Sequence, residues 1–482
     1  MNTAVCPPKR DGLFAGSSPA CSHILRCLLL LLFLPLSILH AQSGGPGTGT
    51  AADDQLLQQA SAAMDAGDVA QAEPLLRSLL ARHPHNFEIN EILGLLYAAQ
   101  GRIAQAAPLM ETAVHEQPGS DIAHANLGAA YLKLGRAADA ARELETAARL
   151  NPSNASTQAT LGQAWMLLKQ PSKAVAAFTI ALSADGFNPD LLYNTALAHY
   201  DSGDAAQGEV LLARMPGVEA SAEAQSLYGD IEEKLEHYQQ AAQHYINAAK
   251  LAPTETNVYI LGSEFLRHWT FDAAIQEFEA GARQYPDSPR MRLGLGIAYY
   301  GAVSYQKAIP VFAGLLRENP GNSLYAELLG RSCMVLTEGS DPGCSTLNDY
   351  AEGHPGNALL NTYAATMILH QAGDDTQLQL ARGFLENASK ANPHLPEAMY
   401  GMGLLLQRES QWAQSIPVLE KAVHAKPDYA AAHYRLALAY SHGGEREKAQ
   451  TEIALEKKYS HQEQNDLDNR LEQVTTLMVS MR

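Results

Sequence analysis

Small and apolar residues recur along residues 87–154 with a period of 34, in two copies that follow each other without a gap. In the first copy, Leu93 and Tyr97 are four residues apart and therefore share one face of a helix. Farther along the same copy, Ala106 and Met110 have the same spacing and mark one face of a second helix. The pattern predicts a pair of helices that repeats along the chain.

The repeat also contains small residues and a proline at fixed places. Gly128 and Ala140 carry almost no side chain, so the two helices of a pair can approach closely, and Pro152 cannot continue a helix and ends the unit. The pattern L-G-x-x-Y…A…F/L…A…P resembles the tetratricopeptide repeat family. Its positions are Leu93, Gly94, Tyr97, Gly101, Ala106, Met110, Ala113 and Pro118 in the first copy, and Leu127, Gly128, Tyr131, Gly135, Ala140, Leu144, Ala147 and Pro152 in the second.

This register can be followed from residue 53 to about residue 459, which predicts an all-α chain. The resemblance implies a right-handed superhelical α-solenoid of about twelve helix pairs, in which the first helix of each pair lines a concave groove. A solenoid grows by stacking, so the length does not imply several separate globular domains. The predicted units are residues 53–86, 87–120, 121–154, 155–188, 189–221, 222–254, 255–288, 289–322, 323–357, 358–395, 396–429 and 430–463.

Three units depart from the pattern, and one of them, residues 358–395, is longer by a few residues. In residues 189–221, Gly208 replaces the small alanine of the second helix, and the unit ends in Met-Pro-Gly. A glycine inside a helix costs about 1 kcal/mol relative to alanine, so we expect the stack to bend or loosen here. Residues 323–357 contain one extra residue, and Asp341 followed by Pro342 predicts the start of their second helix.

The N-terminal 41 residues are typical of a secretory signal peptide. Basic residues precede a mostly apolar run, residues 27–39, which is too short to cross a bilayer of about 30 Å comfortably and is followed by Ala41. We expect cleavage after Ala41 and hence export to the periplasm or the medium; an uncleaved signal anchor is the alternative. Residues 42–52 are rich in glycine and predict a flexible linker.

The C-terminal segment, residues 460–482, no longer follows the repeat. Leu467, Leu471, Val474 and Met478 form one apolar stripe on an otherwise polar helix. A solenoid needs an element that covers its last exposed face. We therefore predict that this segment is a C-terminal capping helix.

The chain is acidic, with 52 Asp and Glu against 34 Lys and Arg and a net charge of −18. Removal of residues 1–41 takes away three basic residues and one acidic residue, which leaves 31 against 51, or −20. Nucleic-acid binding needs clustered cations, so the composition argues against it. It argues equally against adhesion to an anionic membrane surface, and we expect no membrane span after signal cleavage.

Only two of the five cysteines, Cys333 and Cys344, lie outside the predicted signal peptide. An even pair in an exported protein is a candidate disulfide. Cys333 falls late in a first helix and Cys344 early in the second, so the two side chains can meet across the helix pair. The alternative is that each packs separately as a small apolar residue.

The sequence contains no recognisable catalytic or metal-binding motif. His-Glu-x-x-His, Gly-x-Ser-x-Gly and Cys-x-x-Cys are all missing, and the glycines near residue 294 lie within a repeat helix and not after a strand. We therefore expect a protein that is not an enzyme and that needs no cofactor or metal.

Tyrosines and arginines gather at the positions expected to face the groove. Both residue types are enriched at binding hot spots, and arginine would favour an acidic segment or a free carboxylate. The alternative is that the arginines pair with glutamates and the tyrosines pack between repeats. The candidate binding residues are Tyr193, Tyr200, Tyr259, Arg267, Arg290, Ile297, Tyr300, Arg331, Tyr400, Arg408, Tyr434 and Arg435.

These observations predict a non-catalytic scaffold or adaptor of the cell envelope that binds a segment of a partner protein in its groove. The alternative is a groove for a non-protein ligand, such as an exported polysaccharide, in an accessory of an envelope biogenesis or export machine. Tyrosine-rich surfaces suit both kinds of ligand.

Overall fold

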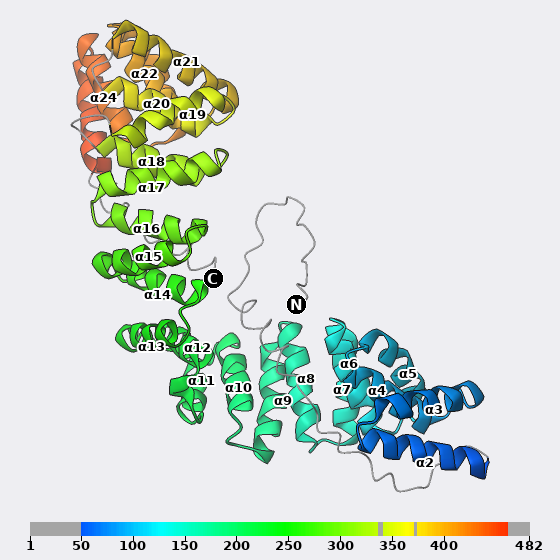
Figure 1. Cartoon of the computed structure of the whole chain (residues 1–482). Helices are drawn as coiled ribbons and strands as arrows, with labels where there is room; N and C mark the ends of the chain where they lie inside the picture. The colour runs from blue at the N-terminus through cyan, green and yellow to red at the C-terminus, as the bar shows by residue number, and fades with distance from the viewer. Residues whose placement is uncertain (1–49, 336–340, 371–373, 461–482) are drawn as a thin grey trace. The chain divides into compact units, whose positions relative to one another are not determined.

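The fold is built from helices that pair in sequence, as a computed structural model shows for residues 50–335, 341–370 and 374–460 (Figure 1). The chain divides into two units, residues 1–252 and residues 253–482. Every regular element of the described residues is helical, which confirms the all-α prediction. The right-handed winding of the solenoid stays a prediction.

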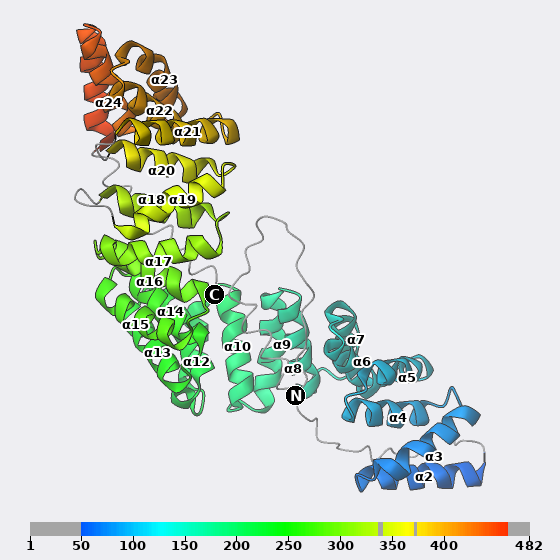
Figure 2. The same cartoon turned by 45° about the horizontal axis from the view of Figure 1, so that its top comes forward.

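The described part of the first unit contains six pairs of helices and one short 3-10 helix. Within this unit each helix packs against the next one, as α8, α9 and α10 do in both views (Figures 1 and 2). The elements are α2 (Ala51–Asp65), α3 (Val69–Arg82), α4 (Phe87–Ala99), α5 (Ile103–Glu116), α6 (Asp121–Lys133), α7 (Ala137–Leu150), α8 (Ala155–Leu167), α9 (Pro171–Ala184), α10 (Pro189–Asp201), α11 (Ala205–Ala213), η1 (Val218–Ala220), α12 (Ala222–Lys234) and α13 (Tyr238–Leu251).

The second unit repeats this arrangement. Residues 446–460 are helical as well and follow α24 as the second member of its pair. The other elements are α14 (Glu255–Arg267), α15 (Phe271–Gln284), α16 (Pro289–Gly301), α17 (Tyr305–Glu318), α18 (Ser323–Val335), α19 (Pro342–Gly353), α20 (Ala358–His370), α21 (Asp375–Ala391), α22 (Pro396–Arg408), α23 (Trp412–Ala425) and α24 (Ala430–His442).

The first helix of most pairs begins at a polar capping residue that recurs with the repeat. Its side chain accepts a hydrogen bond from a backbone N–H in the first turn, which is worth about 1 kcal/mol per helix. In the first unit these residues are Thr50, Asn86, Ser120, Asn154, Asn188 and Ser221. The repeat therefore fixes where each pair begins as well as how it packs.

Within a pair, a glycine of the first helix lies against a large side chain of the second. A Cβ on Gly162 would lie 2.5 Å from the Phe178 ring, and a Cβ on Gly296 would lie 2.5 Å from the Phe312 ring. Real side chains do not approach so closely, so any larger residue would push the helices apart. The two rings are almost fully buried at these contacts.

A buried polar residue joins each of several pairs to the one before it. The side-chain nitrogens of Asn90, His124, Gln158 and His433 lie 2.8–3.1 Å from the carbonyl oxygen of the proline six residues earlier. All four side chains are buried. Their hydrogen bonds hold the loop between pairs against the next first helix.

The irregular unit 189–221 differs from the others in the length of its second helix. α11 has nine residues, and Gly217 follows it with a φ of 73°, a conformation that favours glycine. A Cβ on Gly208 would lie 2.9 Å from Ile231 Cδ1. The glycine that we expected to weaken this unit thus also allows α12 to pack closely against it.

The predicted start of the helix after Asp341 is confirmed. Asp341 is the N-cap of α19, and Pro342 is its first residue. Outside the described residues lie the predicted signal peptide (residues 1–41), residues 42–49 of the predicted linker (42–52) and all but the first residue of the predicted capping helix (460–482). The last two linker residues, 51 and 52, belong to α2. No helix in the described part of the chain combines the length and the apolar character that crossing a membrane requires.

Replacing Gly296 by Ala is expected to lower the stability of the second unit by about 1–3 kcal/mol, because the new methyl group overlaps the Phe312 ring. Gly314→Ala, in the second helix of the same pair, is the matched control. No atom lies within 4 Å of its added Cβ, so this change should stabilise by up to about 1 kcal/mol. Urea unfolding followed by circular dichroism compares the two. Equal effects would show that the close contact does not set the helix spacing.

Candidate functional site

The candidate site of the second unit lies where the first helices α18, α20, α22 and α24 adjoin one another. Three of the predicted arginines, Arg331, Arg408 and Arg435, come from three of these helices. Neighbouring first helices pack directly, α18 on α20, α20 on α22 and α22 on α24. The repeat thus brings together residues that are far apart in the sequence.

Arg331 is held by a glutamate of its own helix and lies beside a tyrosine of the next first helix. Its Nη2 atom lies 2.6 Å from Glu327 Oε1, and its Nε donates to the same oxygen at 2.9 Å. Partial burial opposes the charge of Arg331, but Tyr363 and Glu327 raise its pKa overall. Burial, and then the charge of Glu327, raise the pKa of Tyr363 as well. Arg331 is therefore a charged but already partnered group.

Tyr363 can pack across α18 because the residue opposite it is a glycine. A Cβ on Gly330 would lie 2.4 Å from Tyr363 Cγ. The predicted register of this unit, with Leu329 followed by Gly330, therefore also brings the tyrosine close to Arg331.

Arg408 and Arg435 have different surroundings. Arg408 Nη2 donates to the backbone oxygen of Leu369 at 2.6 Å. The Arg435 guanidinium lies close enough to the Tyr400 hydroxyl to oppose the effect of burial, which raises the pKa of Tyr400. Among the described residues, neither arginine forms an ion pair with a carboxylate. We call Arg408, Arg435, His370 and Tyr400 the arginine site.

The pKa of His370 reflects the positive electrostatic potential at this site. Partial burial, and then the charges of Arg435 and Arg408, lower the pKa of His370. Two nearby glutamates are paired with other cations. Glu397 of α22 lies 3.4 Å from Lys426 Nζ, and Glu409, which directly follows Arg408, accepts a hydrogen bond from Arg382 Nη2 at 2.5 Å. The arginine site therefore has an excess of positive charge in an otherwise acidic chain.

Four of the predicted residues are buried, so their side chains offer a partner little surface. The exposed fractions are 0% for Tyr259, 1% for Ile297, 8% for Tyr300 and 6% for Tyr400. Tyr259, for example, packs edge-on against the Phe278 ring, with the ring centres 6.0 Å apart. The physical reason is that these first-helix positions face the adjoining helices, as the alternative interpretation proposed.

Two more predicted arginines form ion pairs with glutamates, as Arg331 does. Arg290 Nε lies 2.7 Å from Glu255 Oε1, and the guanidinium lies over the Tyr259 ring. Arg267 Nη1 lies 3.5 Å from Glu264 Oε2 in the same helix. For these residues the structural interpretation fits best, because each charge is already balanced by a glutamate.

The remaining predicted residues are tyrosines with partly or well exposed rings. Tyr193 and Tyr200 belong to α10 of the first unit, so they do not join the arginine site. Tyr434 is 48% exposed and directly precedes Arg435.

Three residues near the predicted arginines were not predicted from the sequence: Tyr363, Glu327 and His370. Their positions on first helices could have marked them as candidates, but the greater length of unit 358–395 made its repeat positions hard to assign.

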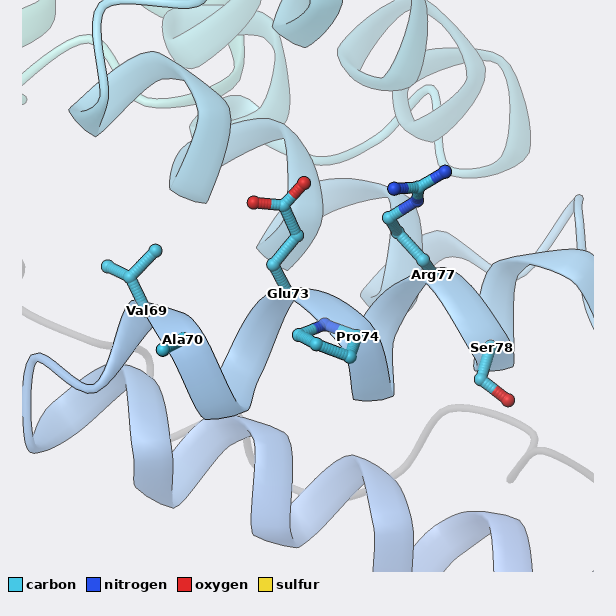
Figure 3. Close-up of a pocket in the computed structure, with 6 residues that line it drawn as sticks. All are labelled: Val69, Ala70, Glu73, Pro74, Arg77 and Ser78. Atoms are coloured by element: carbon cyan, nitrogen blue, oxygen red, sulfur yellow. The ribbon is translucent and has the colours of Figure 1, made fainter.

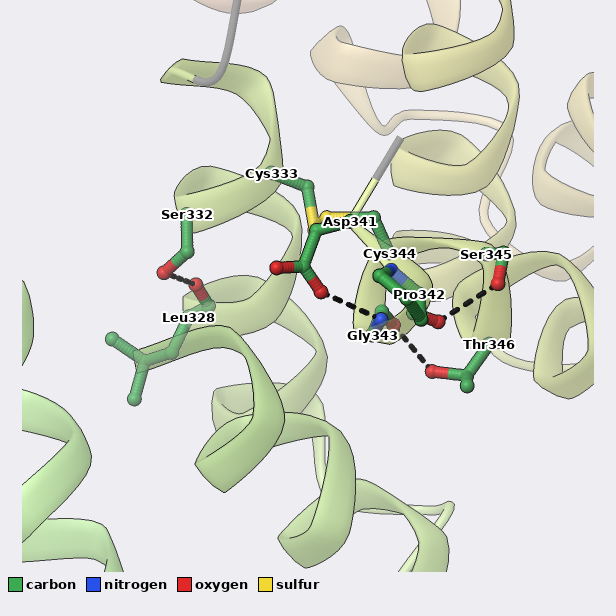
Figure 4. The surroundings of a disulfide bond; sticks show 9 residues. All are labelled: Leu328, Ser332, Cys333, Asp341, Pro342, Gly343, Cys344, Ser345 and Thr346. Carbon is green, nitrogen blue, oxygen red and sulfur yellow. Dashed lines mark hydrogen bonds between the residues drawn. A yellow bond between two sulfur atoms is a disulfide. The ribbon is translucent and has the colours of Figure 1, made fainter. Parts of the chain in front are cut away.

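The two cysteines outside the N-terminal segment form a disulfide in the structure (Figure 4). Their Cα atoms are 5.8 Å apart, and the bond joins the end of α18 to the first turn of α19. Asp341 Oδ1 accepts a hydrogen bond from the Gly343 N–H at 2.7 Å beside it. The cross-link therefore fixes the helix that carries Arg331 to its partner helix.

A shallow pocket lies on α3 of the first unit, and none of the predicted binding residues lines it (Figure 3). Its lining comes from this single helix: Val69, Ala70, Glu73, Pro74, Arg77 and Ser78. Glu73 is already paired with Arg102, whose Nη1 lies 2.9 Å away. We assign no function to this pocket.

Paired helices with a recurring register define a helical repeat protein, a class of interaction scaffold. Tetratricopeptide repeat models match residues 57–121, 261–323 and 400–456, and a second model of the same description matches residues 97–166. The chain is a tetratricopeptide repeat protein. Such proteins generally act as non-catalytic scaffolds that bind other proteins. A search of the curated proteins gave no match.

Several solved structures are similar to this chain at low identity. A structure titled Naa15/Naa10 bound to HypK-THB is 15% identical, with 84% of this chain and 68% of that chain covered and a TM-score of 0.37. The pilF protein of Pseudomonas aeruginosa is 20% identical over 43% of this chain and 94% of that one, with a TM-score of 0.35. YrrB, titled a TPR protein with an unusual peptide-binding site, is 15% identical over 38% and 94%, with a TM-score of 0.35. The family assignment rests on the repeat models and the helix register.

Replacing Cys333 and Cys344 together by Ser is expected to lower the stability of the second unit by about 2–3 kcal/mol, because the unfolded chain then loses a closed loop. Thermal unfolding of the two proteins measures this. Peptide mapping after alkylation, with and without reductant, tests the bond itself. Two alkylated thiols in the unreduced protein would contradict it.

Proposed function

We propose that this protein is a non-catalytic scaffold that binds an acidic segment, or a free C-terminal carboxylate, of a partner protein at the arginine site. The observation that carries the proposal is that Arg408 and Arg435 form no ion pair with a carboxylate among the described residues, while both lower the pKa of His370. A guanidinium binds a carboxylate through two parallel hydrogen bonds, which suits this recognition.

The surroundings of the arginine site support a protein ligand. Tyr434, which is 48% exposed, offers a large and rigid contact surface next to Arg435. Arg331, which we expected to be equally important, is offset by Glu327 and contributes less free charge. We therefore expect the main contacts with the partner to come from α22 and α24.

We also propose that the protein works outside the cytoplasm, in the periplasm or as a secreted chain. The basic and then apolar pattern of residues 1–41 supports this, as does the disulfide, because such bonds persist in oxidising compartments. We propose that it takes part in the assembly of the cell envelope or in an export machine.

Replacing Arg408 and Arg435 together by Gln is expected to weaken binding of a glutamate-rich ten-residue peptide at least tenfold, because two charge-assisted hydrogen bonds are lost. Fluorescence anisotropy measures this in about 0.15 M salt. Arg283→Gln with Arg446→Gln is the matched control, since both arginines lie on second helices and are exposed.

Three further results interpret this experiment. An amidated version of the peptide shows whether the terminal carboxylate or the glutamate side chains are bound. A polysaccharide of uronic acids tests the non-protein alternative. Binding that falls equally in the variant of Arg408 and Arg435 and in the control, or a large loss of thermal stability in the variant of Arg408 and Arg435 alone, would overturn the proposed site.

Binding of the same peptide should tighten as the pH falls from about 7.5 to about 5.5. The free protein holds the pKa of His370 below its usual 6.5, so its imidazole is neutral at pH 7. A bound carboxylate offsets the arginine charges and raises this pKa, so binding takes up a proton. His370→Gln should remove this pH dependence while leaving affinity at pH 7.5 nearly unchanged. An unchanged pH profile in the variant would contradict the role of His370.

A further inference from the structure

Several first helices of the first unit carry carboxylates, whereas those of the second unit carry the arginines of the arginine site. Asp54 of α2 and Glu88 of α4 are close enough for their charges to repel each other. Glu91 lies one turn after Glu88 on the same helix, and its Oε1 accepts a hydrogen bond from Asn126 of α6 at 2.5 Å. We call Asp54, Glu88, Glu91 and Asn126 the acidic seam, because they span three adjoining first helices.

Glu91 is the unusual member of the acidic seam. It is only 4% exposed, and its Oε2 atom has no hydrogen-bond donor. No cation pairs with Glu91 or with Glu88 among the residues that the structure describes. A buried carboxylate without such partners is costly, since water is excluded and nothing replaces it. The seam therefore contains an acceptor that a ligand could satisfy.

A second acceptor on the next first helix points to the same kind of ligand. Gln163 Oε1 of α8 is also buried without a donor. In the described part of the first unit, the side-chain atoms left in this state are both oxygens on first helices. A ligand that forms hydrogen bonds with these oxygens must act as the donor. An ammonium group can donate, and a carboxylate cannot.

The ionisation of the two glutamates is consistent with a missing cation. Burial, and then the charge of Asp54, raise the pKa of Glu88. Burial raises the pKa of Glu91, and the single hydrogen bond from Asn126 offsets this only in part. A positive charge at the seam would reverse both effects.

We propose that the acidic seam is a second binding site, which takes a lysine side chain of a basic segment of a partner protein. The ammonium group lies between Glu88 and Asp54 and binds Glu91, whose Oε2 is covered in the free protein and becomes accessible when that side chain turns. Lysine fits better than arginine because its compact charge on a flexible stem can reach a recessed oxygen, whereas a planar guanidinium needs more room. The chain would thus select partners of opposite charge at its two sites.

The test uses the full chain and a nine-residue peptide of alternating lysine and glycine, with an acetyl-lysine version as the uncharged control. Glu91→Gln keeps the shape of the side chain and its bond to Asn126, and should weaken binding of the lysine peptide about tenfold. Glu88→Gln, at an exposed position, should weaken it less. Glu145→Gln is the matched control, because it removes the same charge from an exposed position of the second helix α7.

Thermal unfolding separates binding from stability. Glu91→Gln removes a buried charge, so its unfolding temperature should be unchanged or higher than that of the wild type. Lower affinity in Glu91→Gln and Glu88→Gln, with Glu145→Gln like the wild type, supports the seam. An equal loss in all three variants means that only net charge attracts the peptide. That result, binding of the acetylated peptide, or no binding at all overturns the proposal.

Discussion

The structure depends on one repeated contact, a residue with no side chain in the first helix of a pair against a large ring or branched side chain in the second. Gly162 meets Phe178, and Gly296 meets Phe312, in each case sixteen residues apart. Because the contact is dry and closely packed, it sets the distance between the helices of a pair. Helix spacing in turn fixes which first-helix residues face a neighbouring helix and which remain accessible.

The two units use the same framework for opposite charges. Among the residues that the structure describes, Arg408 and Arg435 of the second unit lie on adjoining first helices without carboxylate partners, and Glu91 of the first unit is buried without a cation. Neither arrangement is needed for the repeat, whose register residues are apolar or small. Charges left unbalanced on a framework that does not require them are best explained by ligands, which is why the proposed function and the second site rest on them.

The sequence predicted the architecture well, because spacing alone determines which residues share a helix face. The start of α19 at Asp341 and Pro342 followed from local chemistry in the same way. Individual binding residues were harder to predict. Tyr259 lies at a first-helix position that the register places in the groove, yet it is fully buried, and Arg290 is paired with a glutamate 35 residues earlier. Such contacts between repeats depend on the side chains of both neighbours, which a single-repeat pattern does not contain.

The buried polar residue that donates a hydrogen bond to a proline carbonyl affects how histidines in such chains should be interpreted. Asn90, Gln158, His124 and His433 supply the same hydrogen bond, although they belong to three residue types. Exchange among these types can therefore proceed as neutral drift, limited by reach and by the presence of one N–H group. A histidine at this position serves to place an N–H donor within reach of the proline carbonyl oxygen. Its presence alone would mislead a search for catalytic or metal-binding residues in repeat proteins of this kind.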